Sequence, residues 1–488
     1  MYKTHRLAAA LFPGSAATGV RMQDRGKIRE VKILALLCCF VTTATADQFG
    51  DFTYYEDKDS TLTITDYPTN AVGPVAIPAM IAGKPVTRIG YAAFSGCSRL
   101  TSVAIPNSVT RIEHDAFKYC SGLAGVALPA GVASVGRGAF ANCSGLNSIS
   151  VDPANPTYSS ENGVLLNKLK TMLVAYPANR QGAYTIPAGV TRIEDLAFTY
   201  CRGLTGVTIP LGITSIGYGV FSGCSALTNV TIPPGVTHIG LDAFDSCSGL
   251  QSVAIPPSVT TISDHAFSGC RGLTTITIPV GVTIIGGFAF AHCSGLTSVT
   301  IPSSVTTLRG GAFFNCERLS AAVFTGHAPA VEVDSIVFSG TAPGFTVYFF
   351  DVKIGFTSPT WMGYPSVNMG AETPLKTWLV AGGFPYDSNL QSDPNGDGVN
   401  LLMAYALNLD PNQTLSGSLP QPVITSGEMS LSFYAGTAGI TYTVAASGDM
   451  VNWSTDGVTI SGADANQIRT ATVARTGRVR FIRLAVSH

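Results

Sequence analysis

The chain has 488 residues, of which 46% are hydrophobic and only 12% are charged, and its formal net charge is -1. A hydrophobic share of this size can bury a large core, which excludes an intrinsically disordered chain. The balanced charge and the lack of a Lys/Arg-rich run argue against a nucleic-acid partner. The length allows two or three domains.

Residues 1–46 have the pattern of a secretory signal peptide. Basic residues precede the apolar stretch 33–41, which is too short to cross a bilayer. Residues 44–46 (Ala-Thr-Ala) then form a small-residue cleavage site before Asp47. Met22 would be a more ordinary start than Met1. The sequence therefore predicts an exported protein, secreted or at the cell surface, with no transmembrane segment in the mature chain. A buried core strand is the alternative interpretation of the apolar stretch.

Self-similarity decides the expected fold. Nine cysteines after residue 46 are spaced 23 residues apart, with one interval of 58, and each has a Phe three residues before it and a Leu three residues after it. The unit reads V-T-x-I-G-x-x-A-F-x-x-C-x-x-L-x-x-V-x-I-P, and its nine copies fill about residues 86–325. The wider interval holds 35 extra residues, about 155–189, which look like one longer repeat with its own strand pair.

One unit contains two short strands and a turn. L-x-x-V-x-I-P alternates with period two and ends in Pro, V-T-x-I-G is a second extended piece, and A-F-x-x-C suits a single helical turn. A single unit cannot bury its own Leu, Val, Ile and Phe, so the copies are expected to stack along one axis. The prediction is a solenoid with a parallel sheet and short helical turns.

The unit resembles the BspA-like leucine-rich repeats of bacterial and some protist surface and secreted proteins. Segments 213–233 (ITSIGYGVFSGCSALTNVTIP) and 158–177 (YSSENGVLLNKLKTMLVAYP) carry the resemblance, which covers half of the chain. It implies a curved leucine-rich-repeat solenoid with its main sheet on the concave face, and it implies no particular ligand. Residues 47–85 and 326–370 are expected to cap the two ends of the array.

The nine repeat cysteines occupy one position of the unit, so their side chains should point the same way in an inward row. Such a row does not favour disulfides, because bonded thiols must point toward one another. We therefore expect buried, reduced thiols that act as small hydrophobes. No CxxC pair or Cys/His cluster indicates a transition-metal site.

The composition changes after residue 370. Residues 373–411 predict a short helical segment with a dockerin-like half of a calcium loop, in which Asp393, Asn395 and Asp397 supply side-chain oxygens and Val399 a carbonyl. Position twelve of the loop is Ala404 instead of an acid. Two interpretations stay open: calcium as the one expected cofactor, or an Asx-rich turn that caps the next helix.

Residues 420–488 contain five short strands between Gly, Asn and Asp turns, which predicts a small β-sandwich. Together with residues 373–411, this segment is similar to a C-terminal module of large bacterial exported proteins. The expected architecture is thus a solenoid followed by a small helix-plus-β-sandwich domain.

Nothing in the sequence predicts an enzyme. The histidines fall at different positions of the unit, and no nucleophile, zinc or phosphate-binding motif is present. A glycan-active enzyme with paired carboxylates remains a distant alternative.

Outward positions of the main strand are the expected ligand surface, and they form a neutral, hydroxyl-rich row. The row comprises Ser102, Thr208, Asn229, Thr231, Ser252, Thr275, Thr277, Ser298 and Thr300. The leading hypothesis is a surface protein that binds a protein or a glycan through this row. The alternatives are an envelope spacer, and a wet strand face that carries Thr and Ser only because they form strands well.

Overall fold

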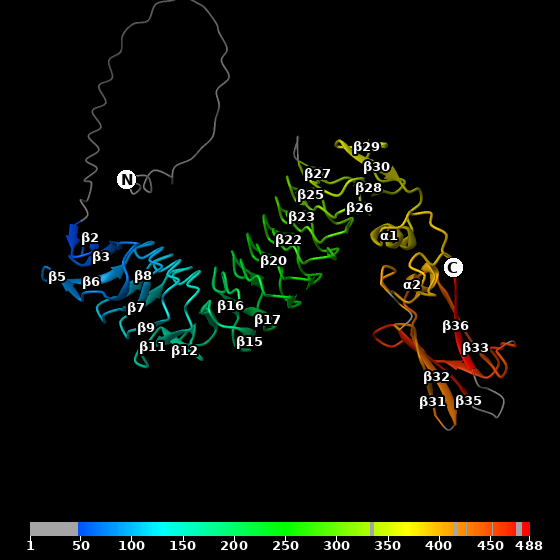
Figure 1. Ribbon diagram of the computed structural model, residues 1–488, viewed down its shortest axis with the longest axis horizontal. Coiled ribbons are helices and arrows are strands. Elements are labelled where there is room, and N and C mark those ends of the chain that lie inside the picture. Colours follow the sequence, from blue (N-terminus) through cyan, green and yellow to red (C-terminus); the bar gives the residue numbers. More distant parts are fainter. Residues whose placement is uncertain are drawn as a thin grey trace, which may run out of the picture. The chain divides into compact units, whose positions relative to one another are not determined.

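The computed structural model describes residues 47–331, 336–413, 415, 417–425, 427–450, 452–474 and 481–488. The predicted signal peptide, residues 1–46, lies outside the described residues. From Asp47 onward the chain is built almost entirely of short strands, and the repeats stack one after another along a solenoid (Figure 1). The predicted fold class is confirmed.

Most repeats contribute one strand to a first set of parallel sheets, which we call the long-strand series, and the repeat around Thr277 contributes only an isolated bridge to Thr300. Its members are β4 (Gly73–Ala76), β7 (Leu100–Ala104), β9 (Gly125–Leu128), β11 (Ser148–Val151), β15 (Gly182–Thr185), β17 (Leu204–Thr208), β19 (Asn229–Thr231), β21 (Ser252–Ala254), β24 (Ser298–Ile301), β26 (Ala321–Phe324), β28 (Thr346–Phe349) and β30 (Tyr364–Asn368). Equivalent residues of successive repeats are in register, as in Asn229↔Ser252. The series is interrupted between β11 and β15 and between β21 and β24.

The V-T-x-I pieces form a second set of parallel sheets, the short-strand series. Its members are β3 (Leu62–Asp66), β6 (Lys84–Ile89), β8 (Arg111–Ile112), β10 (Ser134–Val135), β14 (Met172–Ala175), β16 (Arg192–Ile193), β18 (Ser215–Ile216), β20 (His238–Ile239), β22 (Thr261–Ile262), β23 (Ile284–Ile285), β25 (Thr307–Leu308) and β27 (Ala330–Val331). At the amino end, β1 (Asp47–Phe49), β2 (Phe52–Glu56) and β5 (Met80–Ile81) pair antiparallel to this part of the chain. Near the far end, β29 (Thr360–Trp361) pairs antiparallel with β30.

The A-F-x-x-C segment between the two series consists of turns and not of the expected helical turn. Most repeats have a residue of positive φ on either side of the Phe, such as Asp242 (54°) and Ser246 (58°), and left-handed residues interrupt a right-handed helix. The Phe amide instead donates to the next repeat, as Phe244 N does to Ala266 O at 2.8 Å. The turns are therefore a third hydrogen-bonded ladder between repeats.

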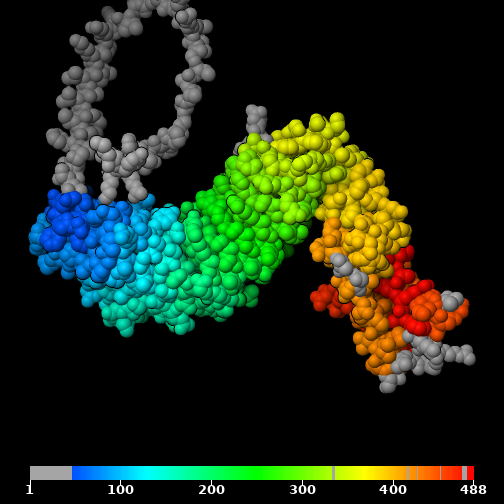
Figure 2. Space-filling view, viewed as in Figure 1, coloured from blue at the N-terminus to red at the C-terminus, as the bar shows by residue number. Residues whose placement is uncertain are grey.

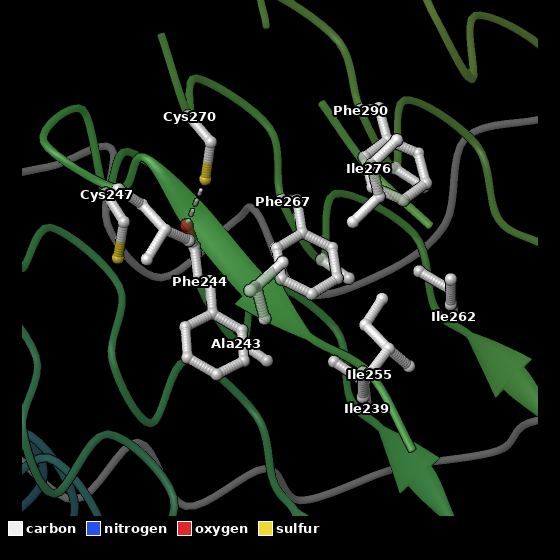
Figure 3. Packing of buried hydrophobic residues seen from close by; sticks show 14 of the residues in the cluster. Ile239, Ala243, Phe244, Cys247, Ile255, Ile262, Phe267, Cys270, Ile276 and Phe290 are labelled. Carbon is white, nitrogen blue, oxygen red and sulfur yellow. Dashed lines mark hydrogen bonds between the residues drawn. The ribbon is translucent and has the colours of Figure 1, made fainter. Parts of the chain in front are cut away.

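The interior of the solenoid is a stack of identical layers. Phe244 lies parallel to Phe267, with ring centroids 5.2 Å apart and an interplanar angle of 2°, and both rings are fully buried (Figure 3). All nine cysteines are buried, as predicted. Seven of the thiols donate to the Phe carbonyl of the previous repeat, as Cys270 Sγ does to Phe244 O at 3.3 Å (Figure 3). Cys97 donates to Tyr67 O and Cys201 to Tyr176 O instead. The strands, the turns and the thiols of one repeat thus bond to the neighbouring repeat, so the stability of the solenoid comes from stacking.

The long repeat divides this interior in two. It adds β12 (Tyr158–Glu161) and β13 (Val164–Asn167), which run antiparallel beside β14. Alternate side chains of β13 face opposite sides: Leu165 packs in the core that precedes it, and Val164 and Leu166 pack in the core that follows. The apolar interior is therefore two cores that share β13, and not the single continuous one that a uniform repeat implies.

Asn155 fixes the start of the long repeat. Its side chain is fully buried and makes four hydrogen bonds of 2.8–2.9 Å: Nδ2 donates to Pro129 O and Val132 O, and Oδ1 accepts from Thr157 N and Tyr158 N. Replacing Asn155 by Leu should lower the free energy of unfolding by about 2–3 kcal/mol. The reason is that Leu fills a similar volume but leaves four backbone groups without a hydrogen-bond partner. Urea denaturation would measure the loss.

Asn179 offers the matched control for this substitution. It belongs to the same long repeat, but its side chain is exposed and bonds to Asn147 at 3.0 Å. Asn179→Leu should change stability by less than about 0.5 kcal/mol. Equal losses for the two variants would show that Asn155 has no special role.

A helix and a small domain follow the repeats. Helix α1 (Pro374–Ala381) begins after Thr373, whose hydroxyl accepts from Lys376 N, and α2 (Leu401–Ala406) begins after Asn400. The predicted β-sandwich consists of two antiparallel sheets, β31 (Pro422–Ile424), β32 (Glu428–Tyr434), β35 (Ile468–Ala474) and β34 (Val458–Ile460) in one, and β33 (Thr441–Ser447) and β36 (Phe481–Ser487) in the other. Phe433 and Val444 from the two sheets share one small core.

Candidate functional site

The predicted ligand row lies on the outward face of the long-strand series, where alternate residues point away from the core. Thr208 and Thr231 are exposed. Val230, which precedes Thr231 in the same strand, points the other way and is buried. Ser252 donates to Asn229 Oδ1 at 2.7 Å, so these two side chains form a polar bridge across neighbouring strands. Because the repeats stack at the spacing of paired strands, about 4.8 Å, the row presents one or two small polar groups per step. We call these nine side chains the hydroxyl row.

Hydroxyls of the row differ in their partners from other hydroxyls of the repeat. Thr237 Oγ1 donates to Thr214 O at 3.5 Å and Thr283 Oγ1 donates to Thr260 O at 3.2 Å, each bridging one repeat to the previous one. Among the described residues, by contrast, the row members Thr208 and Thr231 make no side-chain hydrogen bond. The hydroxyls of Thr237 and Thr283 thus link neighbouring repeats, whereas those of Thr208 and Thr231 face solvent.

One end of the hydroxyl row is covered. Ser298 donates to Ala381 O at 2.7 Å, and both Ser298 and Thr300 are half-buried because α1 packs on β24 and β26. The outward positions of β26 are apolar here: Ala321 and Val323 are buried together with Val380 of α1. The repeat spacing places Ser298 in the predicted row, but it does not reveal that helix α1, 83 residues later in the chain, accepts a hydrogen bond from the Ser298 hydroxyl.

The predicted calcium loop is held by its own backbone. Asp393 accepts from Gly396 N, Asp397 N and Gly398 N at 3.0, 3.2 and 2.7 Å, and Asn395 Nδ2 donates to Gln413 O at 2.8 Å. Hydrogen bonds from Leu415 N and Val399 N lower the pKa of the Asp397 carboxyl. These are the bonds of an Asx-rich turn.

Only half of a calcium shell fits this loop. Asp393, Asn395, Asp397 and the Val399 carbonyl can supply oxygens, but Leu401 and Ala404, at positions nine and twelve, are buried apolar residues of α2. In the described parts of the chain, no group of three or more His, Cys, Asp or Glu side chains could hold a metal ion. Calcium binding therefore stays a prediction.

Replacing Asp393 by Ala should lower the stability of the C-terminal module by about 1–2 kcal/mol, because three amide groups lose their acceptor. The measurement is thermal unfolding of residues 47–488 in EDTA and in 1 mM calcium. If the turn alone matters, the loss is the same in both solutions. A wild-type midpoint that rises with calcium, and an Asp393→Ala midpoint that does not, would instead show that the loop binds the ion.

Most of the larger polar and aromatic side chains lie elsewhere, on the turns and the short-strand series. Examples are Tyr91, which is 70% exposed, Tyr218, and the ion pair of Asp264 with Arg309 at 3.2 Å. This ion pair was not predicted from the sequence. The signal for this pair was present, because Arg309 stands where most other copies have Gly or Glu.

Figure 2 shows the repeats in contact along the array, with colours that change without a gap from β2 to β27. In the described part of the chain, no helix has the length and apolarity that a bilayer crossing requires.

Comparison with known proteins agrees with this architecture. Residues 76–172 and 181–286 match the family model described as BspA type leucine rich repeat region, in six copies. No protein with a curated description matches the sequence.

Several solved structures of leucine-rich-repeat proteins are similar over part of the chain. One from Bacteroides ovatus is 22% identical and covers 71% of this chain and 93% of its own, with a TM-score of 0.41. Another from Eubacterium ventriosum is 24% identical and covers 55% and 94%, with a TM-score of 0.40. A leucine rich cell surface protein from Faecalibacterium prausnitzii is 25% identical and covers 58% and 95%, with a TM-score of 0.36. The register of the strands and the buried Phe and Cys rows agree with this family match, in which residues 76–172 and 181–286 are similar to BspA-type leucine-rich repeats.

Proposed function

We propose that this chain is an exported or cell-surface binding protein, without enzymatic activity, whose hydroxyl row contacts a protein or a glycan. The observation that supports this function is that the hydroxyls of the repeats differ in their hydrogen-bond partners. Thr237 and Thr283 bond to the previous repeat, whereas Thr208 and Thr231 are exposed and have no hydrogen-bond partner among the described residues. A hydroxyl that faces solvent can both donate a hydrogen bond to a ligand and accept one from it.

The row suits weak contacts that are repeated along a polymer. It carries no charge and no Trp, Tyr or Arg, the residues that dominate tight protein interfaces. Single hydrogen bonds to solvent-facing groups contribute about 0.5–1.5 kcal/mol each, so affinity has to come from several repeats at once. The covered end at Ser298 and Thr300 limits the contact to the part of the row before β24.

The test is binding of residues 47–488 to a printed glycan array and to an array of purified extracellular proteins. Thr208→Val/Thr231→Val keeps the shape of both side chains and removes the hydroxyls, so it should weaken binding to the best hit at least fivefold. Thr214→Val/Thr307→Val is the matched control, because these hydroxyls also lack a partner in the described chain but lie outside the row.

Binding should also persist in 1 M NaCl, since the row is neutral. Binding that salt abolishes, or that the control pair reduces as much as the row pair, would contradict the proposal. Ordered self-association without binding to either array would favour the spacer alternative.

A further inference from the structure

A groove beside the short-strand series contains a pair of charged side chains, which the hydroxyl row lacks. It lies where the short-strand series meets the turns, has a volume of about 320 Å³, and is lined by Leu241, Ser263, Asp264, Ile284, Gly286 and Arg309, among others. This volume falls in the range of small-ligand sites. The lining residues come from four successive repeats, so the stacking of the solenoid creates the groove.

Its polar centre is the pair of Asp264 and Arg309. Arg309 Nη1 lies 3.2 Å from Asp264 Oδ1, and the same oxygen accepts from Gly287 N at 2.8 Å. Gly286 permits this arrangement, because a Cβ at that position would lie 2.6 Å from Asp264 Oδ1. The carboxylate is thus fixed by the backbone of the next repeat and by a guanidinium two repeats away.

The pair keeps unused hydrogen-bonding capacity. Asp264 Oδ2 accepts no hydrogen bond from the described residues, and Arg309 uses one of its five N–H groups on Asp264. The side chains are 43% and 49% exposed, so both reach solvent in the groove. Their charges cancel, and an ionic ligand would gain little over water. A ligand that offers a hydroxyl donor beside an oxygen acceptor would satisfy both groups at once.

Apolar and aromatic surface surrounds this centre. Leu241 is 44% exposed and Ile284 is half-buried in the groove. Directly after Asp264 and Gly287 in the chain, the rings of His265 and Phe288 stack with centroids 5.3 Å apart and an angle of 9°. Both rings are half-buried on the turns that follow these residues.

We propose that this groove binds a neutral saccharide unit. Asp264 accepts a hydrogen bond from one sugar hydroxyl, Arg309 donates to the oxygen next to it, and the C–H face of the ring covers Leu241 and Ile284. Charge-assisted bonds of this kind are stronger than those between neutral groups. The site is separate from the hydroxyl row, so the inference goes beyond the function proposed above.

The experiment uses residues 47–488 and a printed array of neutral oligosaccharides, followed by isothermal titration with the best-bound oligosaccharide. Arg309→Gln and Asp264→Asn should each weaken binding at least tenfold, and Leu241→Ser at least threefold. Arg137→Gln is the matched control, because Arg137 also pairs with an acid, Asp195, at 3.5 Å, Asp195 also accepts from a backbone amide, Tyr218 N, at 3.0 Å, and neither side chain lines the groove. It should change affinity less than twofold.

Thermal unfolding of each variant verifies that the fold is kept, and Leu241→Ser tests the groove independently if an Arg309 or Asp264 variant is unstable. Thr208→Val/Thr231→Val should leave this binding unchanged, which separates the groove from the hydroxyl row. The proposal is overturned if no neutral oligosaccharide binds, if Arg309→Gln and Arg137→Gln have equal effects, or if only a protein or peptide competes for the groove.

Discussion

Replacing Phe244 by Ala is expected to lower the free energy of unfolding by about 3–5 kcal/mol. The ring is fully buried and lies 5.3 Å from Phe221 and 5.2 Å from Phe267, nearly parallel to both. Removing it opens a cavity in the middle of a ladder, and both neighbouring repeats lose a packing partner. The solenoid cannot close the gap, because hydrogen bonds fix the backbone of each layer to the next one.

Urea denaturation followed by circular dichroism measures this effect. The control is Phe314→Ala, because Phe314 is a half-buried turn residue that touches Phe288 edge-on at 6.0 Å. The control should cost less than about 1.5 kcal/mol. Similar losses for both substitutions would mean that the Phe ladder is not the main source of stability.

Raising the pH from 7.5 to 9.5 is expected to reduce the free energy of unfolding by an amount on the order of 7 kcal/mol. The cause is the row of buried thiols. Burial raises the pKa well above the ordinary value in four of them: Cys224, Cys247, Cys270 and Cys293. The neighbouring thiol of Cys143, together with burial, raises the pKa of Cys120 in the same direction.

The sign follows from linkage. In the folded chain these thiols stay neutral, whereas in the unfolded chain they ionise above a pKa of about 8.5. The stabilisation is complete below that value and is lost as the pH rises above it, by roughly 1.4 kcal/mol per pH unit for each of five thiols. Tyr184, whose pKa burial raises to about 12, adds to the loss only at higher pH.

Unfolding in urea under argon with a reductant, repeated across this pH range, measures the slope. Cys247→Ala/Cys270→Ala removes two of the five thiols and should reduce the slope by about two fifths. An equal slope in the variant and the wild type would contradict the prediction. Labelling of the native protein with a thiol reagent should remain slow at pH 9, since the reactive thiolate is absent.

Much of the fold could be predicted because the repeat fixes both contacts and direction. The 23-residue spacing from Cys201 to Cys316 predicted the stacking, the inward Phe and Cys rows and the two strands of each unit. Five strands of the C-terminal sandwich were also predicted, since their alternation is regular. The strand β31 was missed, because PVI offers too few residues to show a period.

Other features depend on contacts that no local pattern encodes. The turns have positive φ at ordinary residues such as Tyr119 and Phe288, where sequence propensities favour Gly. Bonds to the neighbouring repeat select this conformation, so the expected helical turn did not form. In the same way, the approach of Asp264 to Arg309 depends on the lateral offset between layers, and the covering of Ser298 depends on where α1 lands.

The strand β13 has a consequence for how this protein fails. A uniform array transmits damage from one coil to the next, because each coil depends on its neighbour. Here Leu165 packs in the first core and Val164 and Leu166 pack in the second, so β13 separates the solenoid into two compartments, each with its own core. A defect near Phe117 should melt the first compartment while the second keeps its shape, and heating such a mutant should give two separate steps instead of one.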